Sequence, residues 1–165
     1  MPTEAWLRGP IPNVLPELMP AAHMLTQSGE ELAAAVQNLT ASQLWVTPGQ
    51  AASIGFHLRH IAGAIDRLLT YSRGEALTEA QHTALKAEKE PAPGTSVTTL
   101  LDGAWVAIEQ ALSALRSTKR EDLFVPRGVG RAQLPSSVMG LLYHIAEHTV
   151  RHTGQVIATS RALRS

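Results

Sequence analysis

Four long segments of this chain repeat apolar side chains at every third or fourth position, the spacing that lines up one side of an α-helix. The segments cover about residues 16–39, 50–72, 97–117 and 136–162. In the second segment the apolar stripe runs through Ile54, Leu58, Ile61 and Ile65. No segment shows the sustained alternation of a β-strand, and only the short run at residues 123–125 is ambiguous. The sequence therefore predicts an all-α protein.

Shorter signals lie between the long segments. Thr78 and Gln81 have the spacing of a capping box, so a short helix is expected to begin there and to continue to about Glu88. The turn-rich run VPRGVGRAQLPSS is expected to be a loop. Four long helices and one short helix predict a four-helix bundle with a short extra helix, as a single domain over residues 1–165. The connections are long enough for both up-down-up-down and crossover topologies, so periodicity leaves the topology open.

Charge and cysteine content narrow the functions that such a bundle could have. Lysine plus arginine equal aspartate plus glutamate at 14 each, without a basic cluster, so neither nucleic acid nor a membrane is an expected partner. The first residues lack the pattern of a signal peptide, and no stretch is apolar for the ~18 residues of a membrane span, so we expect a cytoplasmic protein. Because the chain has no cysteine, any metal must be held by nitrogen and oxygen.

Histidines are grouped in two of the predicted long helices. The last helix carries His144, His148 and His152 at a spacing of four residues, and the second carries His57 and His60. At about 100° per residue, His148 and His152 fall on or beside the apolar stripe, whereas His144 points further round the helix. Two inward histidines one turn apart would each need a buried partner, and a shared metal ion serves both. On the second helix periodicity leans slightly to His57 over His60.

The segments SIGFHLRHIAGAIDRLL and HIAEHTVRHTGQVI together resemble the DinB/YfiT-like superfamily. Members of that superfamily are four-helix bundles that bind a divalent metal through three histidines. The resemblance implies a bundle of this type and metal ligands at His60, His148 and His152, with His60 in place of His57. The run after the last histidine also fits the family, except that Thr153 stands where an arginine is common.

Three neutral histidines around a divalent ion leave at least one coordination position open, as in catalytic rather than closed structural sites. Among the metals that accept nitrogen ligands, we expect zinc first and nickel second. The superfamily includes thiol S-transferases, which implies a metal-dependent enzyme whose open site activates a small thiol for S-transfer. The alternatives are a metal-dependent hydrolase that uses metal-bound water, and a non-catalytic protein that binds a metal or a ligand.

The sequence assigns no catalytic side chain. Glu147 lies four residues before Arg151, which predicts a solvent-exposed ion pair rather than a general base. Asp66 is expected either to pair with Arg59 or Arg67 or to be exposed. The expected partners are a small-molecule substrate, such as a low-molecular-weight thiol, and a second copy of the chain in the homodimer that the resemblance implies.

Overall fold

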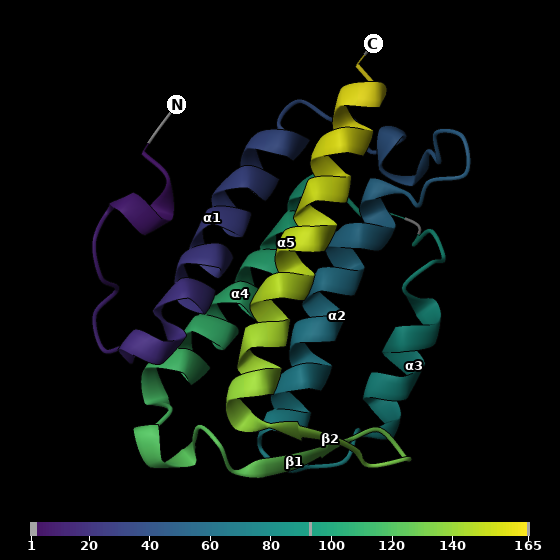
Figure 1. The fold of residues 1–165 in the computed structure, drawn as a ribbon. Coiled ribbons are helices and arrows are strands. Elements are labelled where there is room, and N and C mark those ends of the chain that lie inside the picture. Colours follow the sequence, from purple (N-terminus) through teal and green to yellow (C-terminus); the bar gives the residue numbers. More distant parts are fainter. Residues whose placement is uncertain (1–2, 93, 165) are drawn as a thin grey trace.

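A computed structural model describes residues 3–92 and 94–164 of the chain. Its body consists of four long helices, shown in Figure 1: α1 (Met19–Val36), α2 (Ile54–Ser72), α4 (Val97–Ser117) and α5 (Val138–Ala162). The short helix α3 (Glu79–Ala87) lies outside the four, beside α2. Short 3-10 helices occupy Ala5–Leu7, Pro16–Leu18, Gln43–Trp45 and Arg120–Asp122. The prediction of a four-helix bundle with a short extra helix is confirmed.

Local sequence signals set the starts of the helices. Ser53 caps α2, because its hydroxyl accepts the backbone N–H of Phe56 at 3.1 Å. Thr78 and Gln81 form the predicted capping box before α3. Both α1 and α2 begin later than predicted, in the case of α1 because Pro16–Leu18 forms a separate 3-10 turn. The start of α2 matters most here, since it sets the position of the histidines that follow.

The apolar stripes of the four long helices meet in one hydrophobic core. On α5 the inward positions of the helical repeat are all buried, and they are Val138, Leu142, Ile145, Thr149 and Val156. On α2 the buried stripe comprises Ile54, Leu58, Ile61 and Ile65. Periodicity therefore identified the inward faces of both helices that carry grouped histidines. None of the described helices is both long enough and apolar enough to cross a membrane.

Neighbouring helices in the bundle are mostly not neighbours in the sequence. The α1 helix packs against α4 and α5, and α2 packs against the same two helices from the opposite corner. Figure 1 shows that α1 and α5 run in parallel, as do α2 and α4. Because α2 and α4 share a direction, the chain has to return along the bundle between them, and α3 lies on this return path. Of the two topologies that periodicity left open, the protein adopts the crossover type.

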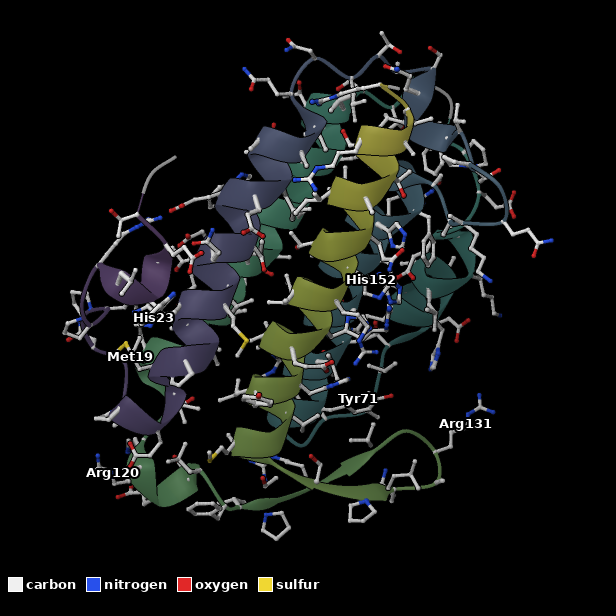
Figure 2. The ribbon with its side chains drawn as sticks, turned by 45° about the horizontal axis from the view of Figure 1, so that its top comes forward. Met19, His23, Tyr71, Arg120, Arg131 and His152 are labelled. Atoms are coloured by element: carbon white, nitrogen blue, oxygen red, sulfur yellow. The ribbon has the colours of Figure 1, made fainter. Side chains whose placement is uncertain are left out.

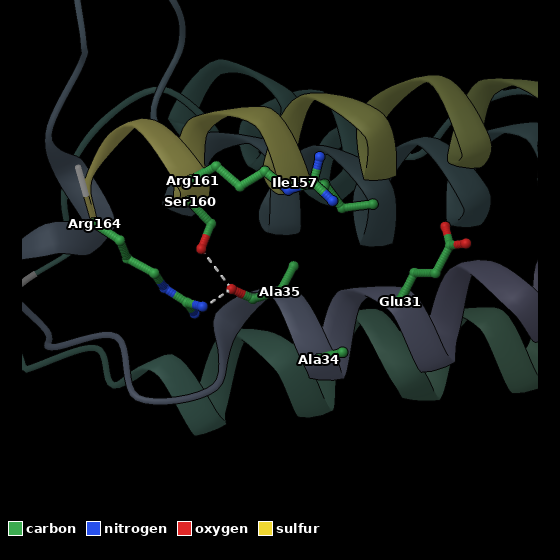
Figure 3. A pocket seen from close by; sticks show the side chains of 7 residues that line it. All are labelled: Glu31, Ala34, Ala35, Ile157, Ser160, Arg161 and Arg164. Carbon is green, nitrogen blue, oxygen red and sulfur yellow. Dashed lines mark hydrogen bonds between the residues drawn. The ribbon is translucent and has the colours of Figure 1, made fainter. Parts of the chain in front are cut away.

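The parallel helices α1 and α5 are tied together at their carboxyl ends. Ser160 Oγ donates to the backbone carbonyl of Ala35 at 2.6 Å, and Arg164 donates to the same carbonyl at 2.9 Å (Figure 3). Arg164 also donates to the carbonyl of Gln37 at 2.6 Å. Carbonyls in the last turn of a helix lack a partner within the helix. Ser160 of α5 and Arg164, which follows α5, therefore cap α1 and help to hold the parallel pair in register.

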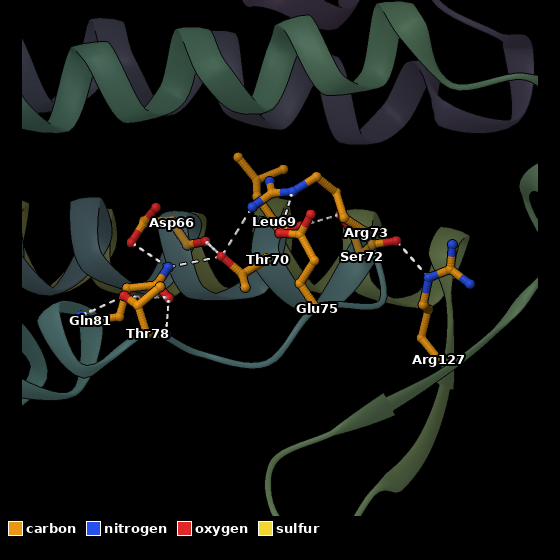
Figure 4. Close-up of polar contacts among 9 residues, drawn as sticks. All are labelled: Asp66, Leu69, Thr70, Ser72, Arg73, Glu75, Thr78, Gln81 and Arg127. Carbon is orange, nitrogen blue, oxygen red and sulfur yellow. Dashed lines mark hydrogen bonds and ion pairs between the residues drawn. The ribbon is translucent and has the colours of Figure 1, made fainter.

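The segment predicted as a loop before the last helix contains a β-hairpin, so that prediction was wrong. Strand β1 (Pro126–Val129) pairs antiparallel with β2 (Leu134–Ser137). These short strands are rich in glycine, proline and serine, and they show no alternating apolar pattern that could have identified them. Arg127 Nε donates to the carbonyl of Ser72 at 2.6 Å, so the hairpin also closes the end of α2 (Figure 4). The ambiguous residues 123–125 belong to neither strand.

Gly29 of α1 lies directly against the indole ring of Trp105 in α4. A Cβ added at Gly29 would lie 2.8 Å from Cη2 of that ring, closer than carbon atoms pack. We expect Gly29→Ala to lower the free energy of unfolding by about 1–3 kcal/mol, the usual effect of overpacking. The matched control is Gly103→Ala, where nothing lies within 4 Å of the added Cβ. That variant should raise the free energy of unfolding by about 0.5–1 kcal/mol. Urea denaturation measures both, and equal stability of the two variants would contradict close packing at Gly29.

Candidate metal centre

Helices α2 and α5 run antiparallel side by side, and their histidines meet across the contact. One ring nitrogen from each of His60, His148 and His152 lies within 4.8 Å of the others. Figure 2 shows His152 on the side of α5 that faces α2. Among the described residues, these three histidines form the group that could hold a metal ion. They are the three that the family resemblance indicates, and we call them the histidine trio.

The spacing within the histidine trio suits a metal ion. The Nε2 atoms of His60 and His148 are 3.3 Å apart. Two nitrogens bound to a tetrahedral zinc ion at about 2.0–2.1 Å lie about 3.3 Å from each other. The ring centroid of His152 lies 4.5 Å from that of His60 and 4.5 Å from that of His148. Small rotations of the rings would therefore bring a third nitrogen to the same centre.

His57, which periodicity favoured slightly, lies beside the trio. It is 5% exposed, and its Nδ1 lies 2.8 Å from Nδ1 of His152. This hydrogen bond occupies Nδ1 of His152, so Nε2 is the nitrogen of that ring that stays free for a ligand. The position of His57 is that of a ring that orients a metal ligand. Phe56 covers the neighbouring side, because its ring stacks on His60 with centroids 5.2 Å apart and planes 17° from parallel.

The other residues of this part of α5 lie outside the trio, although the ring of His144 packs against that of His148 with centroids 5.5 Å apart. His144 is exposed and its Nδ1 lies 3.1 Å from a carboxylate oxygen of Glu147. Glu147 also forms the predicted ion pair with Arg151 on the surface of α5. Thr153 is buried, and its hydroxyl has no hydrogen-bond partner among the described residues. Glu147 is therefore engaged in the surface ion pair that the sequence predicts, rather than placed as a general base.

Glu88, the carboxylate that lies next to the trio, carries no sequence signal that would have identified it as part of the site. Glu88 directly follows α3 and is 4% exposed. Its Oε2 lies 2.7 Å from Nδ1 of His60, and its Oε1 accepts from Nη1 of Arg67 at 2.6 Å. Since an ionised carboxylate can only accept, Nδ1 of His60 carries the proton and Nε2 keeps the lone pair. The nitrogen that faces His148 is therefore the one able to bind a metal.

The electrostatics of Glu88 favour its charged form. Burial alone would raise the pKa of this carboxyl, but hydrogen bonds from His60 and Arg67 and the charge of Arg67 together lower the pKa below its ordinary value. Arg67 is itself buried, so the two charges compensate each other away from water. Asp66 takes no part, because it accepts from Gln81 at 2.7 Å (Figure 4). Of the two expectations for Asp66, exposure to solvent is the one that the structure bears out.

The imidazoles of His57, His148 and His152 favour their neutral forms. Burial, followed by the charge that neighbouring rings would carry, lowers the pKa of His57 and of His148 to about 4. The same causes lower the pKa of His152 to about 3. A neutral imidazole retains the lone pair that a metal requires. The rings of His148 and His152 are therefore able to act as ligands at neutral pH, without first losing a proton.

The metal-free protein is expected to lose stability as the pH falls below about 6.5. The ordinary pKa of histidine is 6.5, whereas the folded protein lowers the pKa of His57, His148 and His152 to about 4, 4 and 3. Between these limits the unfolded chain binds more protons than the folded one. The free energy of unfolding therefore decreases as the pH is lowered. Thermal unfolding with a chelator present checks this. The His148→Gln/His152→Gln double variant should flatten the profile, and an unchanged slope in that variant would contradict the assignment.

Comparison with known protein families agrees with the fold. The family model of the DinB superfamily matches residues 24–156, a span that includes the whole histidine trio. No curated protein sequence matches the chain.

Solved structures share the same fold. A conserved protein from Enterococcus faecalis has a TM-score of 0.69 at 17% identity, covering 87% of this chain and 95% of that one. A DinB-like protein from Bacillus cereus has a TM-score of 0.63 at 22% identity, covering 84% and 87%. YfiT from Bacillus subtilis, described as a probable metal-dependent hydrolase with an unusual four-helix bundle topology, has a TM-score of 0.67 at 15% identity, covering 94% and 93%. The fold and the family match over most of its length show that this chain belongs to the DinB superfamily.

Proposed function

We propose that His60, His148 and His152 bind one divalent metal ion, zinc in the first place and nickel in the second, in an enzyme that activates a small thiol for S-transfer. The observation that carries this proposal is the convergence of three ring nitrogens from two facing helices within 4.8 Å. Imidazole nitrogens suit zinc and its first-row neighbours. Three protein ligands leave a coordination position for a substrate, which a closed structural site of four ligands would not.

The environment of the trio supports a metal ion over a purely packed cluster. Glu88 occupies Nδ1 of His60 and His57 occupies Nδ1 of His152, so both rings turn Nε2 toward the centre of the trio, where Nε2 of His60 lies 3.3 Å from Nε2 of His148. The lowered pKa of His148 and of His152 disfavours a proton as that partner. Bound there, a divalent metal would lower the pKa of a coordinated thiol or water and so supply a nucleophile at neutral pH.

The carboxylates near the site favour thiol transfer over hydrolysis. Hydrolysis benefits from a general base within hydrogen-bond reach of the attacking water. Glu88 has both oxygens engaged, by His60 and by Arg67, and it lies behind the His60 ring, on the side opposite His148. Glu147 is paired on the surface with Arg151. A thiol has less need of such a base, because its proton is already far more acidic than that of water.

Hydrolysis is the second candidate function. The observation in its favour is the likeness of the fold to YfiT, which is described as a probable metal-dependent hydrolase. That likeness is one of fold alone, at 15% identity. The two functions share the histidine trio and differ in the nucleophile, so experiments on the nucleophile separate them.

Protein purified without added metal is expected to contain stoichiometric divalent metal. Each of His60→Ala, His148→Ala and His152→Ala should lose it while the helical circular dichroism is retained, because two nitrogens hold the ion much less tightly than three. His144→Ala is the matched control, since this exposed imidazole on α5 lies outside the trio. Elemental analysis of the four variants provides the measurement. Full metal content in His60→Ala would reinstate His57 as the third ligand.

Cobalt-substituted protein distinguishes the candidate functions. If the protein is a thiol transferase, adding a small thiol should change the visible cobalt spectrum, because the thiol enters the open coordination position. With an activated aryl halide as acceptor, the new carbon–sulfur bond should form as the carbon–halogen bond breaks, with the thiol proton and the halide released. A spectrum unmoved by thiols, together with turnover of activated esters, would favour the hydrolase instead. Response to neither reagent would contradict both enzymatic functions.

A further inference from the structure

Helix α3 is held to the bundle mainly by polar contacts. None of its nine described residues is buried. At its start, Gln81 donates to Asp66 at 2.7 Å and to Thr70 at 2.8 Å, both on α2 (Figure 4). At its end, Glu88 reaches Arg67 and His60 on the same helix. Because apolar burial contributes little here, these two polar anchors decide where α3 lies.

Gly63 makes room for the second anchor. A Cβ at this position would collide with Oε1 of Glu88 and would lie 2.7 Å from Nη1 of Arg67. Glycine is unfavourable inside a helix because it loses the most backbone freedom on folding. Its presence one turn before Arg67, on the face that α3 covers, allows the carboxylate to approach α2 closely. The close approach is what lets one carboxylate reach both a guanidinium and an imidazole.

We infer that Glu88 is a positioning residue for the metal centre, which holds the His60 ring in the tautomer and orientation that present Nε2 to the metal. This inference rests on the proposed metal binding. A carboxylate on the far nitrogen of a ligating histidine fixes the ring and raises the basicity of the ligating nitrogen. Arg67 holds Oε1 at 2.6 Å, so the carboxylate cannot turn away from His60 without losing a buried ion pair. The end of α3 thereby becomes part of the metal centre.

A simple tether for α3 would not need this arrangement. The ion pair with Arg67 alone would anchor the helix end, yet the second oxygen lies 2.7 Å from the only ring nitrogen of His60 that does not face His148. Energetic coupling between two sites is reciprocal. If Glu88 holds His60 ready for the metal, the metal in turn strengthens the hold of Glu88 on α3. Metal binding is then expected to slow hydrogen exchange of the backbone amides in α3.

The test compares the zinc affinity of Glu88→Gln with that of Gln81→Ala, by competition with a chromogenic chelator. Glu88→Gln keeps the size of the side chain but replaces one carboxylate oxygen by a donor, so zinc should bind about 10–100-fold more weakly. Gln81→Ala removes the other anchor of α3 without touching His60, and its zinc affinity should stay close to that of the parent chain. The visible spectrum of bound cobalt should change in Glu88→Gln and not in Gln81→Ala, because only the first changes the hydrogen bond to the ligand His60.

Gly63→Ala is the second variant, which displaces Glu88 while leaving its chemistry intact. It should weaken zinc binding in the same direction, and it stands in for Glu88→Gln if that variant does not fold. If the parent chain binds zinc and both variants bind it equally well, the inference about Glu88 is overturned and the proposed function stands. Equal weakening in Glu88→Gln and Gln81→Ala would reduce Glu88 to a tether and also overturn it. A parent chain that binds no zinc or other divalent metal would instead overturn the proposed function.

Discussion

The antiparallel contact between α2 and α5 is the interaction on which the candidate site depends. In this arrangement His57 lies across from His152 and His60 lies across from His148, so steps of three and four residues on the two helices match. The apolar neighbours of these rings drive the contact, since each fully buried leucine or isoleucine contributes about 1.5–3 kcal/mol. Because the imidazoles lie beside these apolar side chains, they are buried in the same contact. This burial is the main cause of the lowered pKa of His57, His148 and His152.

The crossover topology adds the component that the contact itself lacks. Because α2 and α4 are parallel, the segment that connects them has to run back along the outside of α2, and this segment contains α3. Its end brings Glu88 to the outer side of the His60 ring, while α5 lies on the inner side. An up-down-up-down bundle would need no such return segment. The connection that the topology demands is thus also the one that delivers an anionic partner to the site.

The site combines two kinds of support for its rings. Nδ1 of His60 is hydrogen-bonded to the carboxylate of Glu88, whose charge is balanced by Arg67. Nδ1 of His152 is instead hydrogen-bonded to the neutral ring of His57. No described carboxylate belongs to the trio itself, so a bound divalent ion would keep its full positive charge at the centre. Such a centre favours an anionic ligand, and a thiolate is a soft anion that suits zinc and nickel. This charge arrangement is the main physical support for a thiol substrate.

The sequence by itself determined the helices, their inward faces and the positions of the histidines, because these depend on local periodicity. It also ranked His57 as more inward than His60, and His57 is indeed buried, but ligation depends on where a lone pair points and not on burial alone. The family resemblance, rather than periodicity, indicated His60. Only the tertiary structure decided the crossover topology, the hairpin and the position of Glu88 beside His60. Glu88 meets His60 across 28 residues and His148 meets His60 across 88, and local patterns carry no information on contacts over such separations.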